Sequence, residues 1–174
     1  VGYFNPIKIL DVMLHNGYDP TTNKKVGIES GDPATFKSID DVMAAYEKQQ
    51  DYMLGKFLDM YSRTLGWHAY TLPTLMGSCF AVGCVEKGKL LQQKGSDHHY
   101  SAVAVTSLAN MVDSFAAMDE CVFKQGFLTM EELVHLLDTN FEGKENMRQM
   151  LLNKAPKFGN DIEEVDKYSY WLVD

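Results

Sequence analysis

Apolar residues recur every three or four positions over most of this chain, a spacing that predicts a mainly helical protein. The longest run begins after Ser38 and reaches Leu65, which predicts one helix of about 25 residues. Ser38 can act as its N-cap, and Asp40 and Asp41 suit the positive end of the helix dipole. The apolar face of this helix comprises Ile39, Val42, Met43, Tyr46, Met53, Leu54, Phe57, Leu58, Tyr61 and Leu65.

Capping residues mark the starts of other helices. Asn5 and Pro6 are typical of an N-cap and a first helical residue. Thr129, with Glu132 three residues later, matches a capping box. Apolar spacing predicts further helices over residues 5–17, 74–91 and 107–124.

The C-terminal part of the chain predicts a helix, a turn and a second helix. Pro156 ends the first helix because it has no N–H and disfavours helical geometry in Ala155. Residues 159–161 (Gly-Asn-Asp) form the predicted turn, since Gly and Asn tolerate positive φ. Glu163 and Glu164 then lie in the first turn of the last helix, where carboxylates are favourable.

The remaining stretches are predicted to be a strand, loops and a break between helices. Residues 100–105 (Tyr-Ser-Ala-Val-Ala-Val) are short and rich in β-formers, so we expect one buried strand there. We expect a loop over residues 19–36, an aromatic, packed break over residues 66–73, and a polar loop over residues 94–99. The predicted fold class is therefore mainly α with one or two short strands.

Composition and charge narrow the possible functions. With 174 residues and 45% hydrophobic side chains, the chain is long enough for one globular domain. A net charge of −8 argues against nucleic acid as a partner, because phosphate contacts need clustered Lys and Arg. No apolar run reaches about 18 residues, so we expect no membrane partner. Cys79, Cys84 and Cys121 lack disulfide or metal-ligand spacing, which predicts reduced thiols in a cytoplasm and no metal site.

Six segments, in the right order, resemble motifs of the glycyl radical enzymes, the pyruvate formate-lyase-like family. The most specific is residues 157–161 (Lys-Phe-Gly-Asn-Asp) followed by Val165 and Asp166, which resembles a late-barrel run. The other five are residues 4–17 (Phe-Asn-Pro to His-Asn-Gly), 30–49 (from Ser-Gly-Asp-Pro), 72–88 (ending Cys-Val-Glu-Lys-Gly), 113–123 (Asp-Ser-Phe-Ala-Ala to Val-Phe) and 140–143 (Asn-Phe-Glu-Gly). The branch they resemble contains diol dehydratases, choline trimethylamine-lyase and arylacetate decarboxylases.

The resemblance implies that this chain is a slice of a larger fold. Glycyl radical enzymes have a ten-stranded α/β barrel, and residues 1–174 would be a single segment of its late region. In that family a stored glycyl radical takes hydrogen from a cysteine, and the thiyl radical takes hydrogen from the substrate. The loops concerned carry Cys-x-Glu and Arg-Val-x-Gly-Tyr, and the second is absent from this sequence. We therefore expect no cofactor in this chain, and a glycyl radical elsewhere that a radical S-adenosylmethionine activating enzyme installs.

One pair of residues invites a catalytic role. Cys84 and Glu86 have the Cys-x-Glu spacing, and a thiol beside a carboxylate suits radical and general-base chemistry. In the family, however, the catalytic loop precedes the helix that residues 5–17 resemble, whereas Cys84 follows it. Cys84 also lies in a helical pattern, so a buried structural cysteine is the favoured interpretation and a thiyl/base pair the alternative.

The resemblance also places a stretch of this chain near the substrate. Residues 94–101 align with a stretch that leads into a strand bordering the family's substrate cavity. The candidate substrate-binding residues are His98, His99, Tyr100 and Ser101, with Glu29 and His68 as further candidates. Two imidazoles and a phenol could hold a carboxylate or phenolic oxygen, as in an arylacetate decarboxylase. The alternative is that His98 and His99 are solvated loop residues without a chemical role.

Two functional hypotheses follow from the sequence. The first is a segment or subunit of a glycyl radical lyase that cleaves a C–C, C–O or C–N bond, decarboxylase-like or dehydratase-like, within a homo-oligomer. Its partners would be the rest of that enzyme, the activating enzyme and a small-molecule substrate. The second is a non-catalytic helical scaffold derived from that family. A segment should expose apolar faces over residues 5–17 and 107–124, whereas an independent domain should cover them.

Overall fold

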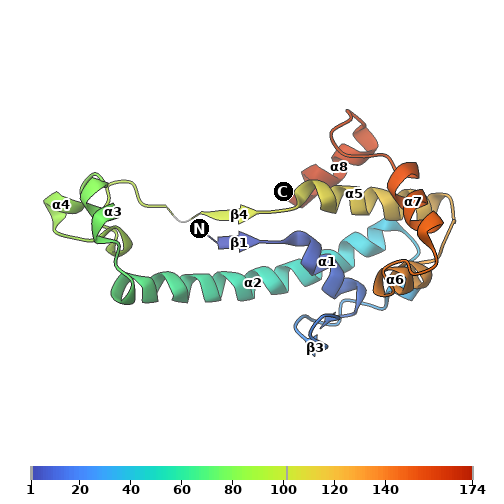
Figure 1. Cartoon of the computed structure of the whole chain (residues 1–174), viewed down its shortest axis with the longest axis horizontal. Helices are drawn as coiled ribbons and strands as arrows, with labels where there is room; N and C mark the ends of the chain where they lie inside the picture. Colours follow the sequence, from blue (N-terminus) through green and yellow to red (C-terminus); the bar gives the residue numbers. More distant parts are fainter. Residues whose placement is uncertain (1, 101, 174) are drawn as a thin grey trace. The chain divides into compact units, whose positions relative to one another are not determined.

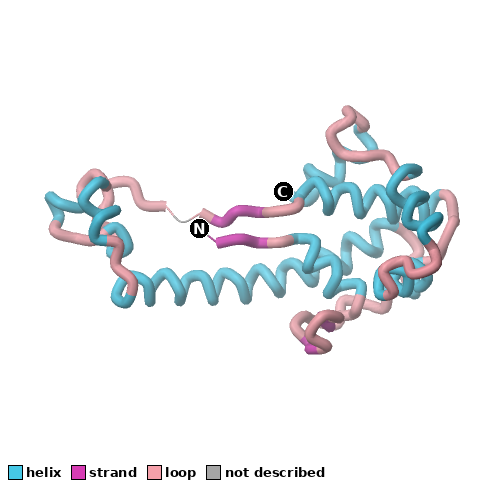
Figure 2. The backbone as a smooth tube through the Cα atoms, in the orientation of Figure 1, coloured by secondary structure: helices cyan, strands magenta, loops and turns pink. Residues whose placement is uncertain are grey.

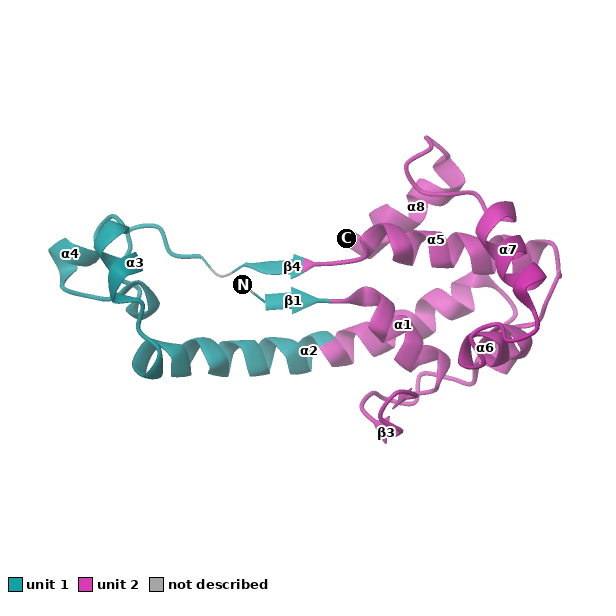
Figure 3. Cartoon of the chain, in the orientation of Figure 1, with its two compact units in different colours: residues 1–4, 54–104 teal, residues 5–53, 105–174 magenta. Residues whose placement is uncertain are grey.

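The computed structural model describes residues 2–100 and 102–173, and helices make up most of it (Figure 2). The predicted composition of mainly helix with few strands is confirmed. The chain divides into two compact units (Figure 3). The larger unit comprises residues 5–53 and 105–174, and the smaller unit comprises residues 1–4 and 54–104. Among the described residues, no helix combines the length and apolar character needed to cross a membrane.

The larger unit is an assembly of helices around α5. Its helices are α1 (Pro6–Leu14), the first part of α2 (Ile39–Thr71), α5 (Leu108–Met118), α6 (Met130–Asp138), α7 (Glu145–Lys154) and α8 (Glu163–Val173) (Figure 1). Helix α5 contacts α1, α7 and α8. The predicted caps are confirmed: Asn5 accepts a hydrogen bond from the Ile7 N–H at 3.2 Å, and Thr129 and Glu132 form a capping box.

Aromatic rings form the core of the larger unit. Phe115 on α5 is fully buried, and its ring meets those of Tyr46, Tyr168 and Trp171 at centroid distances of 5.6, 5.9 and 5.7 Å. Tilted and edge-on contacts at these distances suit the ring quadrupoles. Burial of one such ring contributes about 2–3 kcal/mol to folding. These contacts join α2, α5 and α8.

The helix continues beyond α5 as a π-helical segment, η3 (Asp119–Lys124), so the predicted helix over residues 107–124 is present with a change of pitch. Asp119 on η3 is buried and accepts a hydrogen bond from the Tyr168 hydroxyl at 2.7 Å. Lys124 pairs with the same carboxylate at 2.9 Å. A buried carboxylate needs such partners, and this cluster fixes α8 to η3.

A small hairpin interrupts the predicted loop over residues 19–36. Strand β2 (Tyr18–Asp19) pairs antiparallel with β3 (Lys24–Lys25), and a single 3₁₀ turn, η1 (Pro33–Thr35), follows. Gly17 precedes the hairpin with φ +93°, and a Cβ at this position would lie 2.5 Å from the Ile28 carbonyl oxygen. Only glycine therefore allows this close backbone approach.

The smaller unit contains a pair of strands, the second part of α2 and short helices. Strand β1 (Gly2–Phe4) is a neighbour of β4 (Val103–Val105) in a two-stranded sheet. The Tyr61 hydroxyl on α2 donates to the Ala102 carbonyl oxygen at 3.2 Å. The remaining elements are α3 (Leu75–Phe80), α4 (Cys84–Lys87) and the 3₁₀ helix η2 (Leu91–Gln93).

Two helix predictions in the smaller unit were wrong. The expected break over residues 66–73 starts later, because α2 continues to Thr71. A glycine inside a helix costs only about 1 kcal/mol, so Gly66 alone does not end α2. Its aromatic residues are not packed, since Trp67 and Tyr70 are 60% and 82% exposed. The single helix expected over residues 74–91 is interrupted, because Gly83 adopts φ +89° between α3 and α4.

The prediction of a buried strand was also wrong. Strand β4 starts only at Val103, and Val103 and Val105 are 37% and 57% exposed. Helices α1 and α5 bury apolar residues where the two helices pack against each other, as the independent-domain hypothesis requires. Large exposed apolar side chains gather instead in the smaller unit: Trp67, Tyr70, Leu72, Leu75, Met76, Phe80, Val82 and Val85.

Candidate functional site

The stretch that leads from η2 to β4 carries most of the predicted binding residues. Residues 94–100 are called the strap here. The side chains of His98, His99 and Tyr100 are exposed, Tyr100 to 83%. Ser101 lies outside the described residues. The strap therefore presents two imidazoles and a phenol to solvent, which fits both a pocket wall and solvated loop residues, and a role in binding stays a prediction.

The base of the strap is attached to α4. The Asp97 carboxylate pairs with Lys87 Nζ at 2.6 Å, and the Asp97 N–H donates to the Val82 carbonyl oxygen at 3.0 Å. The Lys87 hydrogen bond and charge lower the pKa of Asp97, so the carboxylate is ionised at neutral pH. We call Lys87 and Asp97 the clamp. The sequence analysis missed the clamp, although Lys87 belongs to the Cys-Val-Glu-Lys-Gly segment and Asp97 directly precedes His98.

Two glycines allow the strap to approach α4 closely. A Cβ on Gly83 would lie 2.4 Å from Asp97 Oδ1. A Cβ on Gly95 would lie 2.2 Å from the Lys89 carbonyl oxygen and 3.0 Å from Cys84 Sγ. Since real Cβ atoms do not make contacts this short, both positions require glycine for the strap to lie where it does.

Cys84 and Glu86 occupy different environments. Cys84 is 3% exposed at the first position of α4 and packs under the strap beside Gly95. Glu86 is exposed to solvent, and residues two apart on a helix do not share a face. This arrangement fits the structural interpretation of Cys84 better than a thiyl/base pair, which remains the untested alternative.

Glu29 and His68 lie in different units. Glu29 belongs to the larger unit, is exposed, and forms an ion pair with Lys25. The Lys25 hydrogen bond and charge lower the pKa of Glu29. His68 is half-buried on α2 in the smaller unit, next to the Trp67 ring. Their predicted roles in a pocket stay predictions.

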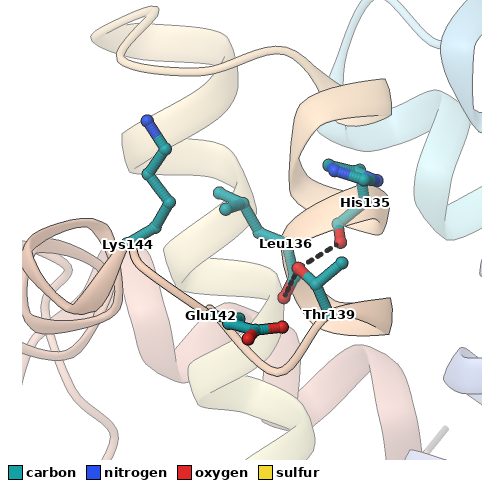
Figure 4. A pocket seen from close by; sticks show the side chains of 5 residues that line it. All are labelled: His135, Leu136, Thr139, Glu142 and Lys144. Carbon is teal, nitrogen blue, oxygen red and sulfur yellow. Dashed lines mark hydrogen bonds between the residues drawn. The ribbon is translucent and has the colours of Figure 1, made fainter.

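Two hollows occur in the larger unit. The smaller, about 270 Å³, lies at the end of α6, lined by His135, Leu136, Thr139, Glu142 and Lys144 (Figure 4). Its Thr139 hydroxyl already donates to the His135 carbonyl oxygen at 2.9 Å. The larger, about 780 Å³, is a groove between α1, α5, α6 and α7 that both leucine and polar side chains line. The Ser114 hydroxyl of the groove likewise donates to a main-chain carbonyl oxygen, that of Asn110 at 2.7 Å, and the described residues hold no cluster of potential metal ligands.

Comparison with known proteins identifies the family of the chain. The family model described as pyruvate formate lyase-like matches residues 1–174. The chain belongs to the pyruvate formate lyase-like family. The resemblance to glycyl radical enzymes seen in the sequence is thereby confirmed.

One relative is a hydroxyproline dehydratase, matched both in sequence and in structure. The trans-4-hydroxy-L-proline dehydratase of Clostridioides difficile is 35% identical over 166 residues, which are 95% of this chain and 21% of that protein. A crystal structure of the hydroxyproline dehydratase from the same organism, with trans-4-hydroxy-L-proline bound, matches with a TM-score of 0.85 and 34% identity, over 96% of this chain and 21% of that one.

A third match is the glycerol-bound B12-independent glycerol dehydratase from Clostridium butyricum, with a TM-score of 0.82 and 33% identity. It covers 96% of this chain and 21% of that one. The present chain thus spans about a fifth of the length of these relatives.

Proposed function

We propose that this chain is the late-barrel segment of a glycyl radical lyase, with residues 1–174 forming one part of its barrel domain. The observation that carries the proposal is the match of the pyruvate formate lyase-like family model to residues 1–174, because it includes every segment that resembles the glycyl radical enzymes. The fold likeness to two dehydratases, with TM-scores of 0.85 and 0.82, supports it.

The reaction that we propose is elimination of water from a small hydroxylated substrate. Both dehydratases named above remove a hydroxyl group together with a hydrogen, so a C–O and a C–H bond break and water leaves. The identities to the hydroxyproline and glycerol enzymes, 34% and 33%, are nearly equal, so they favour neither substrate over the other. Arylacetate decarboxylation, suggested by the two imidazoles and the phenol of the strap, is the second candidate.

The role of this chain in that enzyme is to supply scaffold and pocket wall. His98, His99 and Tyr100 are the residues that would contact substrate, because they are exposed and combine N–H and O–H donors shortly before β4. A carboxylate on the substrate, as in hydroxyproline, is a natural acceptor for these donors. No step of the chemistry is assigned to Cys84 or Glu86.

The enzyme would need parts beyond these residues. A protein glycyl radical, installed by a radical S-adenosylmethionine activating enzyme, would supply hydrogen abstraction through a cysteine on another segment. Such chemistry belongs to an anaerobic cytoplasm, and we expect a homo-oligomer of the whole enzyme. The exposed apolar side chains of the smaller unit, among them Trp67, Met76 and Phe80, support a segment that the rest of a barrel would cover.

The alternative function is a non-catalytic helical scaffold. The observation in its favour is that the larger unit already buries the apolar faces of α1 and α5, as an independent domain would. The two proposals differ in what the strap does. A scaffold gains nothing from the donors of His98 and Tyr100, whereas a lyase loses substrate affinity without them.

The experiment measures turnover by the polypeptide that carries this segment, after that polypeptide has been activated in the absence of oxygen. Trans-4-hydroxy-L-proline, glycerol and an arylacetate are offered separately. We expect loss of water from a hydroxylated substrate, and His98→Ala, His99→Ala and Tyr100→Phe to raise KM about tenfold each, the value of a hydrogen bond to a charged group. His135→Ala, an exposed histidine in the larger unit, is the matched control. Turnover with no response to any strap variant would reject the pocket-wall role.

A further inference from the structure

We propose that the clamp, Lys87 and Asp97, positions the strap for substrate binding, and this rests on the function proposed above. Neither residue needs to touch substrate. Their ion pair fixes the residue immediately before His98, so they act as positioning residues through the strap. The substrate class is the one already proposed, a small hydroxylated molecule.

The clamp fixes Asp97 through both its side chain and its main chain. Its carboxylate accepts from Lys87 Nζ at 2.6 Å, and its N–H donates to the Val82 carbonyl oxygen at 3.0 Å. Gly83 offers no side chain in the space that Asp97 occupies, since a Cβ there would be 2.4 Å from Oδ1. Three groups of the α3–α4 region therefore meet at one residue of the strap.

A second attachment lies two residues earlier in the chain. The Gly95 N–H donates to the Leu90 carbonyl oxygen at 3.0 Å, and Gly95 packs directly on the Lys89 main chain and on Cys84 Sγ. The base of the strap is thus held at Gly95 and Asp97. This contact also gives buried Cys84 a packing role.

The strap beyond Asp97 has little support of its own. The His98 N–H donates to Ser96 Oγ at 3.3 Å, and the same hydroxyl donates to the His98 carbonyl oxygen at 3.0 Å, so these bonds are local. His98, His99 and Tyr100 are exposed. Their direction therefore depends on the attachments at Asp97 and at Ala102, whose carbonyl oxygen accepts hydrogen bonds from the Gly2 N–H and the Tyr61 hydroxyl.

The exposure of the clamp distinguishes positioning from general stabilisation. The Lys87 and Asp97 side chains are 44% and 48% exposed. An ion pair this accessible to water contributes little to global stability. Breaking it should leave the fold intact and release only the strap, which is the behaviour expected of a positioning contact.

The test uses the whole polypeptide in three forms. Two are the single variants Asp97→Asn and Lys87→Met, and the third is the charge-swapped double variant Lys87→Asp with Asp97→Lys. Hydrogen exchange of the Gly95 and Asp97 amides, which donate to the Leu90 and Val82 carbonyl oxygens, should rise about fivefold in each single variant, the equivalent of one hydrogen bond. KM should rise by a similar factor, with kcat and glycyl radical content unchanged. The charge-swapped double variant should lower both the hydrogen-exchange rate and KM part of the way back. Arg63→Met, which breaks the exposed Asp59 pair on α2, is the control.

Each other outcome overturns the inference. Unchanged exchange in both single variants would show that the clamp does not hold the strap, while strap variants could still affect turnover. Faster exchange with unchanged KM would show that the strap is held but does not meet substrate. If His98→Ala and Tyr100→Phe also leave KM unchanged, the proposed pocket-wall role itself fails. A joint fall of kcat and radical content would indicate a structural defect instead of positioning.

Discussion

His15 on α1 is hydrogen-bonded to Asp138 on α6, with 2.8 Å between Nε2 and Oδ1. Its other ring nitrogen, Nδ1, lies 2.7 Å from the Asp11 main-chain carbonyl oxygen. Both partners are acceptors only, so both contacts are hydrogen bonds when the ring is protonated to the imidazolium. Burial lowers the pKa of His15, but hydrogen bonds to Asp11 and Asp138 and the charges of both carboxylates outweigh it, so the net pKa is raised.

This pair makes the attachment of α6 to α1 dependent on pH. Because the pKa is raised in the folded chain, the stabilisation is fully present below the ordinary histidine value of 6.5 and is lost as pH rises through the folded-state pKa. His15→Gln should cost about 0.5–1 kcal/mol at pH 6 and less above the folded-state pKa. Hydrogen exchange of α6 amides at a series of pH values measures this. A pH-independent cost would contradict the imidazolium assignment.

The buried pair of Tyr168 and Asp119 predicts a cost for losing one hydroxyl. Tyr168 is 1% exposed, and its O–H donates to the Asp119 carboxylate at 2.7 Å. Tyr168→Phe should lower the free energy of unfolding by about 1.5–3 kcal/mol, the value of a hydrogen bond to a charged group. Tyr170→Phe, at a position 68% exposed, is the matched control and should have no effect. Denaturant melts compare the two, and equal effects would refute the role of the buried pair.

Adding a methyl group at Gly17 should destabilise the larger unit, whereas the same change at Gly55 should be stabilising. Gly17→Ala places a methyl group 2.5 Å from the Ile28 carbonyl oxygen at φ +93°, so it should destabilise the larger unit by about 2 kcal/mol or more. Gly55→Ala, inside α2 with no atom within 4 Å of the new Cβ, should stabilise by about 0.5–1 kcal/mol. Melting temperatures shifting in the same direction would contradict this account of Gly17.

Replacing Phe80 should affect stability differently in the 174-residue chain and in the whole polypeptide. Phe80 is 84% exposed in the smaller unit. Phe80→Ser should leave the stability of the 174-residue chain unchanged and reduce its self-association, measured by sedimentation. In the whole polypeptide, where we propose that the barrel covers this side chain, the same change should cost about 3 kcal/mol or more. No cost in the whole polypeptide would favour the scaffold.

Local signals predicted the elements of the larger unit well. The N-caps at Asn5 and Ser38, the capping box at Thr129 and the stop at Pro156 all rest on interactions within a few residues, which a sequence displays directly. The last helix begins where Glu163 and Glu164 predicted it.

The smaller unit was predicted less well because its structure depends on contacts between distant segments. The chain at Gly83 lies against Asp97, fourteen residues later, and no local pattern reveals this contact. The pairing of β1 with β4 joins opposite ends of the unit and was missed for the same reason. The strap could be located through the family resemblance, but the clamp that holds it required the structure.

The most direct test of the central claim is electron paramagnetic resonance of the whole polypeptide after anaerobic incubation with a radical S-adenosylmethionine activating enzyme. The account predicts a glycyl radical signal and, with a hydroxylated substrate, release of water from it. A known glycyl radical dehydratase with its own activating enzyme serves as the positive control. Absence of the signal in the polypeptide that carries this segment, while the control shows it, would contradict the assignment to a glycyl radical lyase.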